Sequence, residues 1–286
     1  MNNFYVISNT DKDPGLQTAS MIKEYLTGCG KTCECAGIQR SYGSQDMTTR
    51  VIENIPEETQ CVLVLGGDGT IIQVAGALAK RKLPILGINL GNLGYLAEID
   101  TEQITPTLER LIEDKFDLEN RMMLIGEPTI AGDVKPKELA LNDIVITRNG
   151  PLRVLRYRIY VNDKLLNTYE ADGIIVSTPT GSTGYSMSAG GPIVEPDSQV
   201  LLVTPISAHT LNSRAIVLSP ADVLRIEIAP DKNGVIQNAQ VCFDGGKYYE
   251  MHNTDSVTIA RADVATTVIK MSKESFLNVL ARKISS

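Results

Sequence analysis

The feature that most constrains the fold is an apolar run, Cys61–Leu65, that leads directly into a glycine-rich loop, Gly66–Thr70. A near-continuous apolar run of this length is typical of a central parallel strand that is covered on both faces. The next residues, Thr70–Lys80, carry apolar side chains at helical spacing, and Pro84–Ile88 is another short apolar run. The order strand, helix, strand predicts a parallel α/β sheet in this part of the chain.

The rest of the first hundred residues fits the same alternation. Phe4–Ile7 and Lys31–Ala36 are predicted strands, and a helix is expected between them over residues 13–27. Residues 101–114 are predicted to form one connecting helix. We therefore assign residues 1–100 to an N-terminal parallel α/β domain that binds nucleotide.

The pattern changes near Asp100, because many short β-type runs separated by turn residues follow. Such runs are typical of an all-β sandwich or barrel, so residues 101–261 are predicted to form a β-rich C-terminal domain. The runs are Leu124–Ile130, Leu139–Thr147, Leu155–Val161, Ile174–Ser177, Val200–Val203, Ala215–Leu218, Val223–Ile228, Val241–Phe243 and Ser256–Ala260. A final apolar pattern predicts a helix over Ser272–Ile284 with Ser272 as its N-cap.

Composition excludes several classes of protein. The chain has 286 residues with 27 Lys and Arg against 34 Asp and Glu, and this acidic balance disfavours nucleic-acid binding. No apolar run reaches the ~20 residues of a membrane helix, and the N-terminus does not resemble a signal peptide, so we expect a cytoplasmic protein without a membrane partner. Five cysteines occur, of which Cys29, Cys33 and Cys35 cluster without a nearby histidine. Reduced thiols are therefore favoured over a metal site.

The loop Gly66–Thr70 is predicted to lie at the carboxyl end of a strand and at the start of a helix, where open α/β sheets bind ligands. Its three glycines would let phosphates approach backbone N–H groups, and the helix N-terminus favours negative charge. Asp68 in the middle would repel phosphates, so it suits a base that takes a hydroxyl proton, or a group that helps to hold Mg²⁺. The alternative is an Asp-Gly turn that only ends the strand.

Residues 172–192 form a second candidate ligand loop, rich in small hydroxyl side chains and without charge between Ser177 and Ser188. A flexible linker is the alternative. Apolar residues enter and leave the loop directly, which favours a pocket that hydrogen-bonds sugar and base edges.

Three shorter segments are ambiguous when each is taken alone. Residues 89–96 and the pair Asn142-Asp143 could form turns or contact a ligand. His209 and the segment 243–245 could equally be structural.

Taken together and in this order, the segments resemble the NAD kinases, which phosphorylate NAD to NADP. The residues that carry the resemblance are GGDGT, NLGNLGYL, LNDIVI, DGIIVSTPTGSTGYSMSAGGPIV, TPISAHTLNSRAIVL and FDGG. The resemblance covers about residues 60–245. It implies an α/β domain, a β-rich domain, a C-terminal segment (262–286) that returns to the first domain, and a homodimer or homotetramer.

The resemblance also implies roles for particular residues. Asp68 matches the catalytic aspartate, and Asp143 stands where glutamate is usual, one methylene shorter. Glu170 stands where many relatives carry arginine, a reversal that would affect NADP affinity or a subunit contact. The residues implied to bind the donor phosphates or NAD are Gly67, Gly69, Thr70, Asn89, Tyr95, Asn142, Asp143, Asp172, Thr183, Tyr185, Ser188 and His209.

The implied reaction is transfer of a phosphoryl group from ATP, with Mg²⁺, to the 2′-hydroxyl of the adenosine ribose of NAD. The binding partners would be NAD and ATP, and no resident metal ligands are predicted. Lipid or sugar kinases with GGDGT-type loops are one alternative, although they would lack the TPTGSTGYS loop. A non-catalytic pyridine-nucleotide sensor is another, although a sensor gains nothing from a carboxylate beside phosphates.

Overall fold

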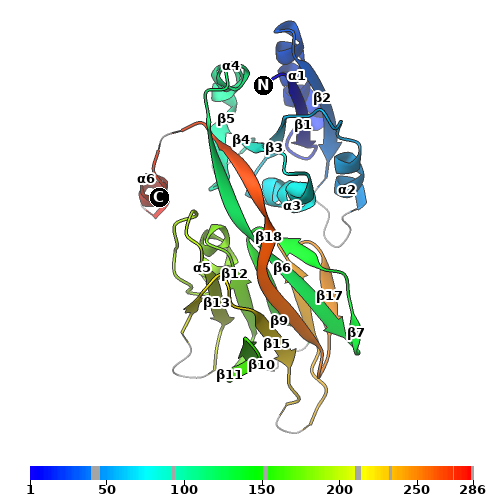
Figure 1. The fold of residues 1–286 in the computed structure, drawn as a ribbon, viewed down its shortest axis with the longest axis vertical. Coiled ribbons are helices and arrows are strands. Elements are labelled where there is room, and N and C mark those ends of the chain that lie inside the picture. The colour runs from blue at the N-terminus through cyan, green and yellow to red at the C-terminus, as the bar shows by residue number, and fades with distance from the viewer. Residues whose placement is uncertain are drawn as a thin grey trace. The chain divides into compact units, whose positions relative to one another are not determined.

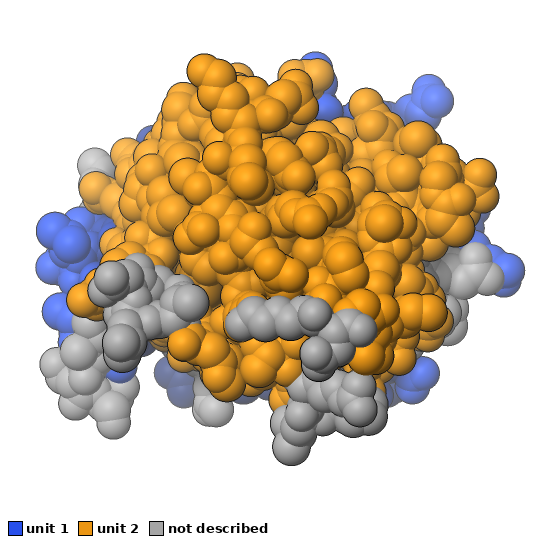
Figure 2. All heavy atoms as spheres, turned by 90° about the horizontal axis from the view of Figure 1, so that it is seen from below, with its two compact units in different colours: residues 1–121, 264–286 blue, residues 122–263 orange. Residues whose placement is uncertain are grey.

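The computed structural model describes residues 1–39, 46–91, 94–150, 154–209, 214–231, 234–272 and 274–284. The chain divides into two compact units, which Figure 2 colours separately: unit 1 comprises residues 1–121 and 264–286, and unit 2 comprises residues 122–263. Residues 101–121, assigned to the β-rich domain from the sequence, thus fall in unit 1. No helix in the described part of the chain is long and apolar enough to span a membrane.

Unit 1 is built on a parallel sheet (Figure 1). Its strands are β1 (Asn3–Asn9), β2 (Thr32–Ile38), β3 (Cys61–Gly66), β4 (Ile85–Asn89) and β5 (Ala97–Asp100). The order is β2-β1-β3-β4, with β5 and the end of β18 (Ser256–Lys270) both parallel to β4. All six residues of β3 are buried, as the apolar run predicts for a central strand.

The helices of unit 1 are α1 (Gln17–Gly28), α2 (Asp46–Glu53), α3 (Asp68–Leu78), α4 (Ile104–Ile112) and α6 (Phe276–Ile284), with 3₁₀ turns at Pro14–Leu16, Ala79–Arg81 and Thr101–Gln103. The helix predicted over residues 13–27 begins later than expected, because Gly15 and Leu16 have positive φ angles. The Asp13 carboxylate accepts the backbone N–H groups of Thr18 and Ala19 and so satisfies the first turn of α1.

The C-terminal helix differs from the sequence prediction in two respects. It begins at Phe276, and Ser275 rather than Ser272 caps it, since Ser275 Oγ accepts the Asn278 N–H at 3.3 Å. Its described apolar side chains are half-buried or exposed, and Leu277 is 64% exposed. The helix therefore contributes less burial than its apolar face suggests. The side chain of Ile284 and the whole of Lys273 lie outside the described residues.

Unit 2 is a sandwich of two largely antiparallel sheets. One contains β11 (Lys164–Ala171), β10 (Leu155–Val161), β15 (Leu224–Ile228) and β18, with β6 (Asp117–Ile130), β7 (Asp133–Val134) and β8 (Glu138–Ala140) paired beyond them. The other has the order β14 (Ile216–Leu218), β13 (Leu201–Ile206), β12 (Gly173–Ser177), β9 (Asp143–Arg148), β16 (Ala239–Phe243), β17 (Tyr248–Met251). Tyr157 and Ile226 of the first sheet share one apolar cluster with Ile144 and Ile174 of the second, so both sheets enclose a common core.

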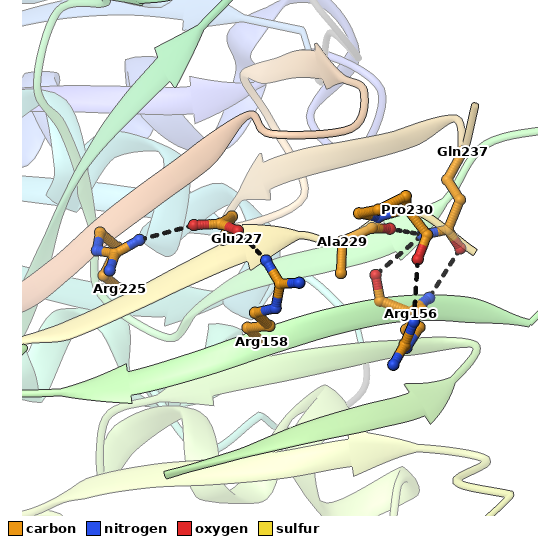
Figure 3. Close-up of polar contacts among 7 residues, drawn as sticks. All are labelled: Arg156, Arg158, Arg225, Glu227, Ala229, Pro230 and Gln237. Atoms are coloured by element: carbon orange, nitrogen blue, oxygen red, sulfur yellow. Dashed lines mark hydrogen bonds and ion pairs between the residues drawn. The ribbon is translucent and has the colours of Figure 1, made fainter. Parts of the chain in front are cut away.

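Polar contacts link the neighbouring strands β10 and β15 and the segment that follows β15 (Figure 3). Glu227 on β15 pairs with Arg158 on β10 at 2.7 Å and with Arg225 at 3.0 Å. The buried Gln237 amide bonds the backbone of Arg156 and the carbonyl of Ala229. These contacts tie the segment that follows β15 back onto β10.

The sequence did not reveal α2, β5, β11 or β17, and it merged β8 with β9. The merged run breaks at Leu141 and Asn142, whose backbone N–H groups bond the Asp244 carboxylate at 2.6 and 2.8 Å. A side chain about a hundred residues away therefore takes the donors that a continuous strand would have used.

Candidate functional site

Asp68 is the first residue of α3 and directly follows β3 and Gly67. Its Oδ2 accepts the Tyr95 N–H at 2.7 Å, and its Oδ1 accepts the N–H groups of Leu96 and Ala97 at 3.1 and 3.2 Å. A Cβ on Gly94 would lie 1.7 Å from Asp68 Oδ1, so only glycine permits this approach. The carboxylate is thus held rigidly, and the remaining lone pairs of a carboxylate could accept one further proton or donor.

Two residues that the resemblance implied as ligands make hydrogen bonds within unit 1. Thr70 is 4% exposed, its N–H bonds Gly67 O, and its hydroxyl accepts Asn9 Nδ2 at 3.1 Å. The Asn89 side chain bonds both the N–H and the carbonyl of Gly91, and also Asp100. These contacts shape the loops around Asp68, and ligand binding by Thr70 and Asn89 stays a prediction.

Tyr95 remains close to Asp68 and also contacts the C-terminal helix. Lys283 Nζ lies 3.9 Å from the centroid of the Tyr95 ring. Burial raises the pKa of Tyr95, and the Asp68 charge adds to the rise. Burial lowers the pKa of Lys283, and Asp68 partly offsets that. Asn92 and Leu93 of the NLGNLGYL segment lie outside the described residues.

In unit 2 the hydroxyl-rich loop after β12 separates into two sets of side chains. Thr178, Ser182 and Ser186 are buried and bond Leu141 O, the Val194 backbone and Thr204 Oγ1 respectively. Tyr185, which is 48% exposed, and Ser188 face solvent on the short helix α5 (Tyr185–Ser188), and Thr183 is half-buried. The internal set makes the loop a rigid structure rather than a linker, and the predicted ligand residues belong to the more accessible set.

This loop packs directly against Asn142 and Asp143. A Cβ on Gly181 would lie 2.1 Å from Asn142 O, and one on Gly184 would lie 3.4 Å from Asn142 Nδ2 and 3.8 Å from Asp143 Oδ2. Within the described residues, the buried Oδ1 atom of Asn142 has no hydrogen-bond partner. An unpaired buried acceptor is costly, so this atom is suited to receive a donor from a ligand.

Asp143 is 7% exposed, and it lies beside Asp244, for which the sequence left both a structural and a functional role open. Burial raises the pKa of Asp143 to about 7, and the Asp244 charge adds to the rise. Burial raises the pKa of Asp244 to about 6, against the opposing effect of three backbone hydrogen bonds from residues 141–143. Asp244 therefore positions the Asn142-Asp143 pair.

The remaining predicted residues lie elsewhere in unit 2. Asp172 Oδ1 is 3.1 Å from Arg148 Nε, so its carboxylate is engaged in an ion pair. His209 is exposed, and its backbone N–H bonds the carbonyl of Glu170. Glu170 lies opposite Arg156 across β10 and β11, with 3.9 Å between the charged atoms.

No group of three or more His, Cys, Asp or Glu side chains among the described residues is placed to hold a metal ion. All five cysteines are free thiols, as expected.

Comparison with known proteins gives consistent results along the chain. Residues 15–116 match the family model for the ATP-NAD kinase N-terminal domain, and residues 141–271 match that for the ATP-NAD kinase C-terminal domain. A protein called NAD kinase from Agathobacter rectalis is 42% identical over 100% of this chain and 99% of its own length. A second, from Lachnospira eligens, is 39% identical over 99% of this chain and 100% of its own length.

Two solved structures are similar. The crystal structure of an NAD kinase from Archaeoglobus fulgidus in complex with ATP has a TM-score of 0.77 and 25% identity, over 99% of both chains. Yeast NADH kinase complexed with NADH has a TM-score of 0.84 at 20% identity, over 100% of this chain and 88% of that one, a likeness of fold.

Proposed function

The chain belongs to the NAD kinase family, and we propose that it transfers the terminal phosphate of ATP to the 2′-hydroxyl of the adenosine ribose of NAD, giving NADP. The observation that carries the proposal is the placement of Asp68. This acid sits at the carboxyl end of a parallel strand, at the first turn of a helix, where α/β sheets bind nucleotides. Three backbone amides fix its orientation.

In the proposed reaction Asp68 accepts the proton of the 2′-hydroxyl as that oxygen bonds the terminal phosphorus of ATP. The bond between this phosphorus and the bridging oxygen breaks, and ADP leaves. The backbone around Gly67 and Gly69 would bind the donor phosphates, since a glycine loop at a helix N-terminus offers N–H groups without a Cβ in the way. Alignment and charge stabilisation supply most of the rate in such transfers.

On the acceptor side, unit 2 supplies a rigid polar surface. The unpartnered Asn142 Oδ1 would accept a hydrogen bond from NAD. Asp143, with its raised pKa, is protonated in part near neutral pH and could donate or accept a bond with a ribose hydroxyl. Thr183, Tyr185 and Ser188 would contribute further contacts, because their side chains are less buried than those of the internal hydroxyl set. Asp172 and His209 would complete the NAD contacts.

We further propose that the donor substrate is ATP complexed with Mg²⁺, that the enzyme acts in the cytoplasm, and that it assembles as a homodimer or homotetramer. Mg²⁺ neutralises charge on the triphosphate. Light scattering coupled to size exclusion measures the assembly state directly, and a monomeric mass would contradict that part of the proposal.

The decisive experiment incubates pure protein with ATP, MgCl₂ and NAD and measures NADP with an NADP-specific dehydrogenase. We expect NADP to accumulate with the wild type and the D68N variant to lose most of the activity. Absence of NADP would overturn the proposal. Retained NAD binding without turnover would then favour a non-catalytic pyridine-nucleotide sensor. Phosphorylation of a lipid or sugar instead of NAD would favour a lipid or sugar kinase.

A further inference from the structure

The strand order of unit 1 defines where its sheet opens. In the order β2-β1-β3-β4, the chain leaves β1 toward one side and leaves β3 toward the other. Ligands of open α/β sheets bind in the crevice outside the carboxyl ends of the two strands at such a reversal. The loop after β3 carries Asp68. The loop after β1 carries Lys12, which neither the motifs nor the resemblance singled out.

Lys12 reaches over the glycine loops of the sheet edge. Its Nζ atom lies 3.1 Å from where a Cβ on Gly67 would be, and 3.3 Å from where a Cβ on Gly91 would be. These glycines follow β3 and β4 respectively. The ammonium therefore lies beside Gly67, in the GGDGT loop at which donor phosphates are proposed to bind.

The backbone that carries Lys12 is held in place. The Lys12 N–H bonds Asn9 O at 3.0 Å, and the Asn9 side chain accepts the Asp11 N–H at 2.9 Å. The same Asn9 side chain donates to Thr70 Oγ1 on the first turn of α3. These hydrogen bonds connect the loop after β1 to the helix that begins with Asp68. The buried Thr70 hydroxyl is the acceptor that joins the two.

The acidic side chains at this edge of the unit 1 sheet also mean that a bound triphosphate needs a cation beside it. A cavity of about 570 Å³ is lined by Lys12, Thr18, Asn89, Leu90, Gly91, Asp100, Thr101 and Glu102. Among these described residues, Lys12 is the single basic side chain against two acids, and Asp68 is a further acid on the neighbouring loop. These carboxylates would repel a triphosphate, so its binding here needs a positively charged side chain. A lysine ammonium can bind phosphate as a point charge.

We propose that Lys12 binds a phosphate group of the donor nucleotide and positions it over Gly67. The inference rests on the proposed function for the identity of the donor, whereas the placement of the lysine is independent of turnover. Lys12 acts on the triphosphate alone, so it contributes to donor affinity and not to recognition of the adenosine part.

The test compares K12M and K12R with K80M. Lys80 is an exposed lysine just beyond the far end of α3, about 16 Å along the helix from the GGDGT loop at 1.5 Å per residue, so its variant matches the change in charge and size. Calorimetry without NAD measures the binding of ATP and of adenosine to each protein, and circular dichroism confirms folding. We expect K12M to weaken ATP about 10- to 100-fold, the usual loss for a hydrogen bond to a charged group. Adenosine binding should stay constant, K12R should restore part of the ATP affinity, and K80M should match the wild type.

Several results would overturn the proposal: unchanged ATP affinity in K12M, equal losses for ATP and adenosine, the same loss in K80M, or no measurable ATP binding by the wild type. Steady-state kinetics add a second readout, in which K12M should raise KM for ATP and leave KM for NAD unchanged. Failure of the proposed function gives a different result: the wild type would make no NADP, and K12M could still bind ATP more weakly than the wild type does.

Discussion

Replacing Asp143 with asparagine tests the buried acid pair of unit 2. Asparagine keeps the shape of the side chain and removes its ionisation. In the folded protein the pKa of Asp143 is raised to about 7, whereas its ordinary value is 3.8. Between these two values the unfolded chain is ionised while the folded chain still holds the proton. The folded state thus binds more protons, and its stability falls as pH rises through this window.

The size of the effect follows from the two pKa values. Each pKa unit between the folded and the unfolded state corresponds to about 1.4 kcal/mol, so their separation corresponds to about 4 kcal/mol of stability once Asp143 is fully ionised. The loss is negligible below about pH 3.8, partial at pH 5 and complete above pH 7. D143N lacks this loss, so its free energy of unfolding relative to the wild type should increase by about 2–3 kcal/mol between pH 5 and pH 8.

Urea denaturation of both proteins at pH 5, 6, 7 and 8 measures this difference, and taking the difference between proteins cancels groups that titrate alike in both. D263N is the matched control, since the same change is made at an exposed acid on β18. A D143N difference that is constant from pH 5 to pH 8 would refute the reasoning, because Asp143 would then ionise in the fold as it does in the unfolded chain.

The remaining predictions concern the reaction and the C-terminal helix. D68N should lower kcat by about 10²- to 10⁴-fold while NAD still binds, and a variant that keeps more than about a tenth of the wild-type kcat would exclude Asp68 as the base. N142A should weaken NAD by about 1–3 kcal/mol in calorimetry and leave ATP unchanged; equal losses for both nucleotides would indicate a structural role. Deleting residues 272–286 removes apolar side chains that, where the structure describes them, are half-buried or exposed, so we expect a loss of about 2–4 kcal/mol and a lower melting temperature with a folded product. An unchanged melting temperature would show that α6 adds no stability.

The sequence by itself determined the fold class of each part of the chain, an α/β part followed by a β-rich part. The apolar run Cys61–Leu65 became the fully buried strand β3, and the short runs after residue 120 became the sandwich of unit 2. Periodicity and turn residues are local properties, so they can be recognised without knowing what packs where. The order of the glycine and hydroxyl motifs likewise indicates the NAD kinase family without any knowledge of the fold.

The roles of individual polar side chains were decided by the tertiary structure. Thr70 and Asn89 belong to motifs that suggest ligands, yet Asn9 and Asp100 engage them inside the protein. Asp244 serves residues 141–143, about a hundred positions earlier in the chain. Lys12 became a candidate ligand only because parallel strands that are distant in sequence end at one edge of the sheet. A hydrogen bond or an ion pair depends on atoms within about 3 Å of one another, and the fold alone brings residues of such sequence separation to that distance.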